Sequence, residues 1–168
     1  SFLALGGDAG SSIPRDLFEI FPDGTTTRVA AFGEVLPGGV GFFPASSSFP
    51  VATGDGDDIA VVNGDGLIAR IDDQWHSIGG DPFASDGSNV VVEDGTVAFR
   101  ERNAVSWWTK DDGLTRIAVG ETLADGAVLQ RLDGFSGFAF DGGVMAFLGL
   151  TDQGAFVYAL DVETGDLE

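Results

Sequence analysis

Three carboxylates beside one short predicted strand offer the clearest potential for metal chemistry. Asp55, Asp57 and Asp58 lie close together, and a second polar group with Asn63 and Asp65 follows the apolar residues 59–62. Calcium takes oxygen ligands from carboxylates and carbonyls, so the sequence predicts a calcium site at the three aspartates. A five-residue strand is about 15 Å long, so one ion would use only one of the two groups. The alternative is a pair of Asp/Gly turns flanking the strand without a metal.

Tryptophans are the candidates for ligand binding. Trp107 and Trp108 are adjacent, and Trp75 lies one repeat earlier. Neighbouring side chains of a strand point to opposite faces, so a sheet buried on one face would leave one indole to present a flat ring to a carbohydrate or a partner. In a propeller both faces of each sheet are covered, and both indoles would then be core residues.

Side chains that commonly carry catalysis are scarce. The chain has no cysteine, a single histidine (His76), a single lysine (Lys110) and a single tyrosine (Tyr158). A Ser-His-Asp triad could use only His76, and a zinc site needs several His or Cys ligands. Two carboxylates can hydrolyse glycosides, but such a pair arises by chance among 27 acidic residues. We therefore expect no enzyme, and no cofactor other than calcium.

The charge of the chain narrows its partners. Eight Lys and Arg residues face 27 Asp and Glu residues, which gives a formal net charge of −19. Such a surface repels phosphate backbones and anionic membranes, so we expect no nucleic-acid binding. No stretch approaches the roughly 20 apolar residues of a membrane span, so we expect no membrane insertion in this segment.

These residues must be positioned by a repeat of short strands. Apolar segments with a central alanine recur at residues 57–62, 94–99 and 141–148, and residues 2–6, centred on Ala4, look like a shortened fourth copy. The glycines Gly33, Gly80 and Gly120 are spaced by roughly 40 to 47 residues, a length typical of propeller blades. No segment shows a sustained helical period.

The repeat predicts the fold class and the domain organisation. We expect one all-β domain over residues 1–168, with about three full repeats near 7–62, 63–101 and 102–149 and partial copies at both ends. Four short strands per repeat predict a β-propeller, or a propeller-like array of four-stranded repeats. The alternative is a two-sheet β-sandwich of pseudo-repeated hairpins.

Two copies of the alanine segment resemble a known family. The runs Gly95-Thr96-Val97-Ala98-Phe99 and Gly143-Val144-Met145-Ala146-Phe147 are similar to secreted bacterial tandem-repeat proteins with an Asn-x-x-Gly-x-x-Ala-Phe motif. The connectors at residues 31–39 and 118–126 are similar to that family's Gly-acidic-x-Leu-x-x-Gly segment. The motif Asn is replaced by Gly54, Val92 and Phe140. The resemblance implies an exported, non-enzymatic role at the cell surface or outside the cell.

The functional expectation combines these points. We expect an extracellular or cell-surface structural module that assembles through strand pairing and face packing, with self-association or surface glycans as its partners. Residues 2–5 and 156–160 would be the strands that pair with another chain, or with each other inside one molecule. The alternative is a carbohydrate- or calcium-binding propeller module.

Overall fold

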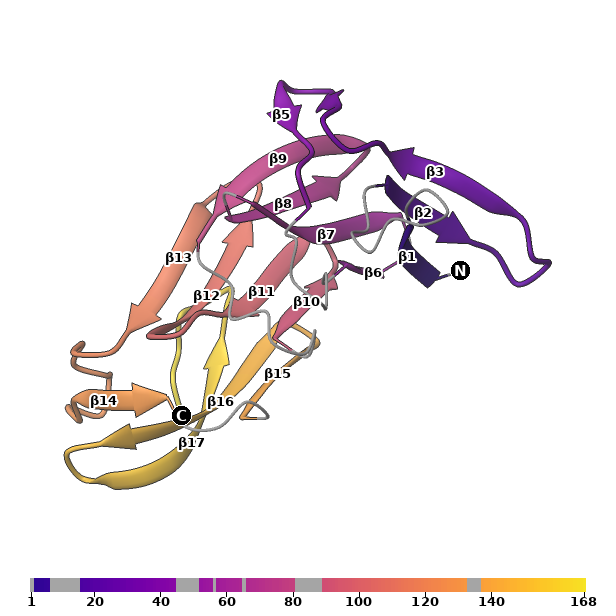
Figure 1. Ribbon diagram of the computed structural model, residues 1–168. Helices are drawn as coiled ribbons and strands as arrows, with labels where there is room; N and C mark the ends of the chain where they lie inside the picture. Colours follow the sequence, from indigo (N-terminus) through magenta and orange to yellow (C-terminus); the bar gives the residue numbers. More distant parts are fainter. Residues whose placement is uncertain are drawn as a thin grey trace.

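The computed structural model describes residues 2–6, 16–44, 52–55, 57–64, 66–80, 89–132 and 137–168, with backbone alone for residues 2 and 52–55. Within these ranges the chain forms strands and turns without a helix, so the predicted all-β class is confirmed. Accordingly, the described residues include no helix with the length and apolarity to span a membrane. The strands form four stacked sheets and one small hairpin (Figure 1).

The first sheet and the hairpin come from the N-terminal part of the chain. The sheet has the antiparallel order β1 (Phe2–Gly6), β2 (Asp16–Ile20) and β3 (Thr26–Ala30). The hairpin β4 (Val35–Leu36) and β5 (Val40–Gly41) follows.

The second and third sheets are four-stranded antiparallel meanders. The second sheet consists of β6 (Ala52–Asp55), β7 (Asp58–Asn63), β8 (Gly66–Ile71) and β9 (Gln74–Gly79). The third sheet consists of β10 (Val90–Glu93), β11 (Thr96–Arg100), β12 (Ala104–Thr109) and β13 (Gly113–Ala118).

The fourth sheet is centred on one long strand. β16 (Val144–Thr151) pairs along its whole length with β17 (Gly154–Asp161). Its other edge is shared by β15 (Phe138–Asp141) and β14 (Leu129–Leu132).

Tight Asp/Gly turns set the register of these sheets. Asp72 and Asp73, with φ of 51° and 61°, join β8 to β9. Asp94 and Gly95, with φ of 46° and 75°, join β10 to β11 in the same way. Two successive positive φ values identify two-residue hairpin turns that match the twist of the flanking strands, and Asp and Gly tolerate this conformation. The aspartates of these turns therefore have a structural role.

Consecutive sheets enclose three separate hydrophobic cores. The core between the first and second sheets contains Leu17, Ala30, Leu36, Phe42, Ile59, Val61, Ile68 and Trp75. The core between the second and third sheets contains Ala60, Val62, Leu67, Ala69, Ile71, Ile78, Val90, Val92, Val97, Phe99 and Trp108. The core between the third and fourth sheets contains Ala98, Val105, Trp107, Leu123, Leu129, Leu132, Phe138, Phe140, Met145, Phe147, Tyr158 and Leu160. The sheets thus stack face to face in chain order, and the second and third are covered on both faces.

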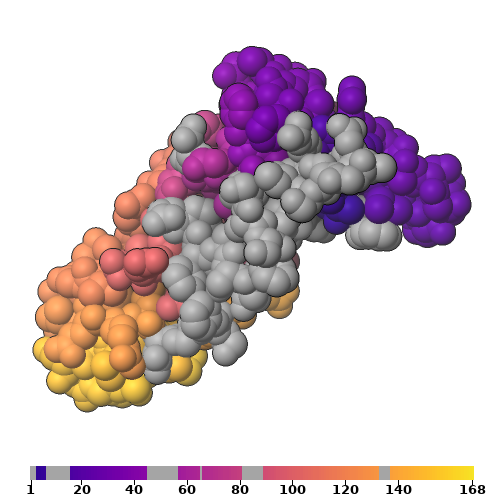
Figure 2. Space-filling view, viewed as in Figure 1, coloured from indigo at the N-terminus to yellow at the C-terminus, as the bar shows by residue number. Residues whose placement is uncertain are grey.

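The stack follows an arc. The first and fourth sheets lie at its two ends, as the ribbon and space-filling views show (Figures 1 and 2). β10 of the third sheet contacts β6 of the second sheet on one side and β15 of the fourth sheet on the other, along the arc. The first and fourth sheets share no core among the described residues, so these residues do not close the arc into a ring. Four main sheets in this part of the chain also differ from the two sheets of a sandwich.

The hydrogen-bonded sheets are out of phase with the sequence repeats. The predicted repeats end at residues 62, 101 and 149, which lie near the end of β7, just after β11 and within β16. The second and third sheets therefore each combine the last two strands of one sequence repeat with the first two of the next. Residues 2–5 pair with β2 and residues 156–160 pair with β16, at opposite ends of the stack.

Candidate functional site

The acidic cluster predicted to bind calcium lies at the turn between β6 and β7. The Asp57 carbonyl oxygen accepts hydrogen bonds from Nη2 and Nε of Arg70, at 2.9 and 3.2 Å. The Asp58 carboxylate accepts the Asp72 backbone N–H at 3.3 Å. The Asp55 side chain and residue 65 lie outside the described residues. Among the groups that are described, no three His, Cys, Asp or Glu side chains are placed to hold a metal ion. The described contacts therefore hold the β6–β7 turn against β8 and against the β8–β9 turn of the same sheet.

A neighbouring hollow contains a cation from the chain itself. An open depression of about 500 Å³ between the turns of the second and third sheets includes four aspartates, among them Asp72, together with Lys110. The Lys110 ammonium lies 3.1 Å from an Asp72 carboxylate oxygen, and both side chains are exposed. Lys110 thus partly neutralises the acidic group and links two sheets.

The three tryptophans fill the cores. Trp75, Trp107 and Trp108 are only 6%, 8% and 7% exposed. Trp107 packs toward the fourth sheet, while Trp108 packs toward the second sheet, so the adjacent indoles do point to opposite faces. Trp75 packs toward the first sheet. Because both faces are covered, no indole presents an open ring surface to a sugar in this arrangement.

His76 lies in packing contact with one of these indoles. Its ring centroid is 5.0 Å from that of Trp108. Its Nε2 atom is buried and has no hydrogen-bond partner among the described residues. In a catalytic triad this atom would share a hydrogen bond with a serine hydroxyl, and none is present among those residues.

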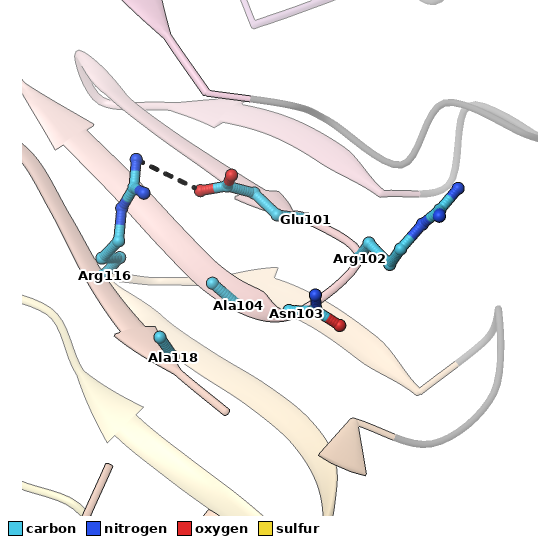
Figure 3. A pocket seen from close by; sticks show the side chains of 6 residues that line it. All are labelled: Glu101, Arg102, Asn103, Ala104, Arg116 and Ala118. Atoms are coloured by element: carbon cyan, nitrogen blue, oxygen red, sulfur yellow. Dashed lines mark ion pairs between the residues drawn. The ribbon is translucent and has the colours of Figure 1, made fainter. Parts of the chain in front are cut away.

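A polar pocket lies where β11 turns into β12. Its volume is about 320 Å³, and Figure 3 shows the six side chains that line it. Buried Glu101 accepts a 2.6 Å hydrogen bond from the Ser106 hydroxyl and lies 3.6 Å from the Arg116 guanidinium. Arg102 extends away from this pair (Figure 3). Glu101 is the one carboxylate among the described residues that line the pocket, whereas glycoside hydrolysis uses two. The sequence analysis did not single out this group, because it depends on the register that places Ser106 opposite Arg116.

The largest departure from regular packing is on the outside of the fourth sheet. We call the face that a sheet turns toward the next sheet its forward face, and the opposite face its rear face. Burial alternates strictly along β16, whose Met145 and Phe147 fill the third core from the rear face. The forward face of the fourth sheet consists mainly of Val144, Ala146, Leu148, Leu150, Ala155, Val157 and Ala159. These residues are half-buried or exposed, and all are apolar.

The strand register identifies equivalent positions in the four sheets. The motif alanines pair as Ala60 with Ala69, Ala98 with Trp107 and Ala146 with Ala159. Two residues before each partner, the same strands carry Leu67, Val105 and Val157. In the first sheet the equivalent residue is Leu17, because a register shift follows Leu17 as it follows Leu67.

Burial at this equivalent position differs sharply at the end of the stack. Leu17, Leu67 and Val105 are 0%, 1% and 0% exposed, whereas Val157 is 72% exposed. Each of the first three belongs to the core shared with the next sheet. The forward face of the fourth sheet therefore has the apolar composition of a face that packs against another sheet, but none of the described sheets packs against it. This face is the candidate functional site.

Comparison of the chain with protein family models, with curated proteins and with solved structures gives no match. The site is therefore assigned from geometry. Its signal in the sequence is the apolar run of residues 144–150, which is typical of a strand buried on both faces. That run indicates that a cover is expected, but it does not identify the strand at the end of the stack.

Proposed function

We propose that this protein is a non-catalytic structural module of the β-propeller type, acting at the cell surface or outside the cell by packing sheet faces against one another. One observation carries the proposal. Val157 is exposed at the position where Leu17, Leu67 and Val105 are each buried by a following sheet.

The energetics of the exposed face support docking. Fully burying one Val or Leu side chain stabilises a contact by about 1.5–3 kcal/mol, and Val144, Leu148, Leu150 and Val157 are together on this face. Contiguous apolar patches on soluble proteins commonly mark interaction sites. A further sheet on this face would therefore gain much of the stabilisation that the three internal cores already provide.

The propeller-type arrangement is supported by the shape of the stack. The second and third sheets are buried on both faces, and β6, β10 and β15 follow one another along the arc. Radial repetition of four-stranded sheets is the propeller pattern. Strand pairing also contributes at the end of the chain, where Leu160 in β17 bridges to Leu167.

The extracellular placement rests on the repeat motif. The runs at residues 95–99 and 143–147 are similar to those of secreted repeat proteins. Fractionation of the producing cell with an antibody against this domain tests the placement. Recovery of the protein from the cytoplasm alone would contradict it.

Dye binding tests whether the forward face is open. At low protein concentration, an apolar fluorescent dye should bind the wild type, and Val157→Asp should remove most of the signal. Val35→Asp is the matched control, because Val35 is also 72% exposed but lies in the β4–β5 hairpin. Equal dye binding by the wild type and Val157→Asp would show that the face is covered within one molecule, and the proposed function would then fail.

A further inference from the structure

We propose that the forward face of the fourth sheet binds the first sheet of a second copy of this chain, head to tail. This inference rests on the proposed function and names the partner of the same site. The argument depends on how the sheets already bind one another inside the molecule.

All three internal interfaces are of one type. In each, the forward face of one sheet packs against the rear face of the next. The stack therefore leaves two faces unmatched among its described residues, the forward face of the fourth sheet and the rear face of the first sheet. One is a forward face and the other is a rear face, like the two sides of each internal interface. A second copy can therefore continue the series without any new kind of contact.

The rear face of the first sheet has the composition that this contact needs. Ala4 lies opposite Phe18, and Phe18 also covers Gly6, where an added Cβ would be 3.0 Å from its ring. By register, Phe18 occupies the position of Tyr158, which is buried in the core between the third and fourth sheets. Ile20 continues this face, and these side chains are half-buried rather than covered.

Both faces have charged groups beside their apolar residues. Arg28 lies opposite Phe18 on the rear face of the first sheet, and its guanidinium is 3.8 Å from the Asp16 carboxylate. The forward face of the fourth sheet has Asp141 and Asp161 on either side of Val144, and exposed Arg131 lies opposite Leu150 on the same face. Both faces thus have carboxylates and one Arg, so the shared type of interface, rather than charge, identifies the partner.

A head-to-tail contact is heterologous, so it closes into a ring or extends into a filament. Each copy carries a formal charge of −19, which opposes association at low ionic strength. Added NaCl screens this repulsion while the apolar contact persists. Assembly should therefore increase with salt, which is the opposite of what an interface held by ion pairs would do.

Two blocked variants test the proposal by sedimentation velocity over a range of protein concentrations. Val157→Asp blocks the forward face, and Phe18→Asp blocks the rear face of the first sheet. The wild type should form oligomers, and each variant alone should stay monomeric, because an unpaired buried carboxylate should weaken the contact at least about a hundredfold. An equimolar mixture should form one-to-one dimers, since each variant keeps the face that the other has lost. Val35→Asp should assemble like the wild type.

The outcomes separate this proposal from the proposed function. A wild type that stays monomeric at all concentrations and salt levels overturns the head-to-tail contact, even if Val157→Asp still removes dye binding. Dimers of Phe18→Asp alone would show contact between two forward faces and would also overturn it. Circular dichroism checks that each variant folds. If either substitution unfolds the chain, Ile20→Lys and Ala159→Arg replace the pair on the same two faces.

Discussion

The Ser106 hydroxyl donates a 2.6 Å hydrogen bond to the Glu101 carboxylate, and both side chains are buried. Glu101 lies at the margin of the core between the second and third sheets, where a Cβ added to Gly80 would be 3.8 Å from its carboxyl carbon. Arg116 extends over the same carboxylate from β13. The pair links the β11–β12 turn to the interior, so it supports packing between sheets.

Ser106→Ala should therefore destabilise the fold without affecting assembly. Glu101 would lose a donor while staying buried, and leaving a buried acceptor without its partner costs about 1–3 kcal/mol. Urea denaturation measures the change. The double variant Ser106→Ala with Glu101→Leu should recover part of the loss, because it removes the buried carboxylate together with its Ser106 donor. A neutral Ser106→Ala would show that the hydrogen bond adds nothing to stability.

Gly79 and Gly80 provide a matched test of how closely the sheets approach. Both have positive φ, at 80° and 78°. A Cβ on Gly79 would meet no atom within 4 Å, whereas a Cβ on Gly80 would lie 2.7 Å from the Phe99 ring. Gly79→Ala should cost about 1–2 kcal/mol from backbone strain alone. Gly80→Ala should cost a further 1–3 kcal/mol, roughly, from overpacking. Equal urea midpoints for the two variants would contradict this account of the interface.

Tryptophan fluorescence tests whether the indoles are core residues. Because Trp75, Trp107 and Trp108 are buried between sheets, acrylamide should quench the native protein weakly and the denatured protein strongly. Trp107→Ala should destabilise the fold by about 3–5 kcal/mol through loss of packing. Titration with saccharides should leave the native emission unchanged. A saturable emission change with a sugar would instead support the carbohydrate-binding alternative.

The all-β class and the regular spacing of the strands could be predicted because they depend on the local sequence. Asp72-Asp73 and Asp94-Gly95 are turn pairs, and the apolar segments between them have the length of strands. The sequence could not show which consecutive strands form one sheet, because a repeat can be divided at any of its turns. The segment at residues 2–6 shows a related ambiguity. Aligned by Ala4, it matches Ala60, but the observed register puts Leu3 at that place, and a shift of one residue exchanges the two faces.

The site was harder to predict, because residue type does not report what covers a face. Trp75, Trp107 and Trp108 were reasonable ligand-binding candidates by chemistry, yet stacking on both sides buries them. Val157 has the same side chain as Val105, and its sequence context is equally apolar. Their difference arises only because Val105 lies in an inner sheet and Val157 in the last one.

Acid stability should depend in part on Asp161, at the end of β17. The backbone N–H groups of Thr164 and Glu163 donate to its carboxylate at 2.9 and 3.0 Å. The bond from Thr164 is the main cause that lowers the pKa of Asp161 below its ordinary value. A carboxyl whose pKa is lower in the folded state contributes stability above its unfolded pKa, and that contribution is lost as the pH falls through the folded pKa. NMR titration of the side-chain carboxyl should therefore give a midpoint below that of an unstructured Asp.

Asp161→Asn should remove this pH dependence locally. The turn after β17 holds Glu168 against Ala159 through two backbone hydrogen bonds of 2.9 Å. Above the unfolded pKa, the variant should exchange the Glu168 and Ala159 amides faster than the wild type, and below the folded pKa the two proteins should exchange alike. Asp141→Asn, which removes the same charge from the same sheet, should leave both amides unchanged. Similar exchange in Asp161→Asn and wild type at neutral pH would show that the carboxylate does not hold the turn.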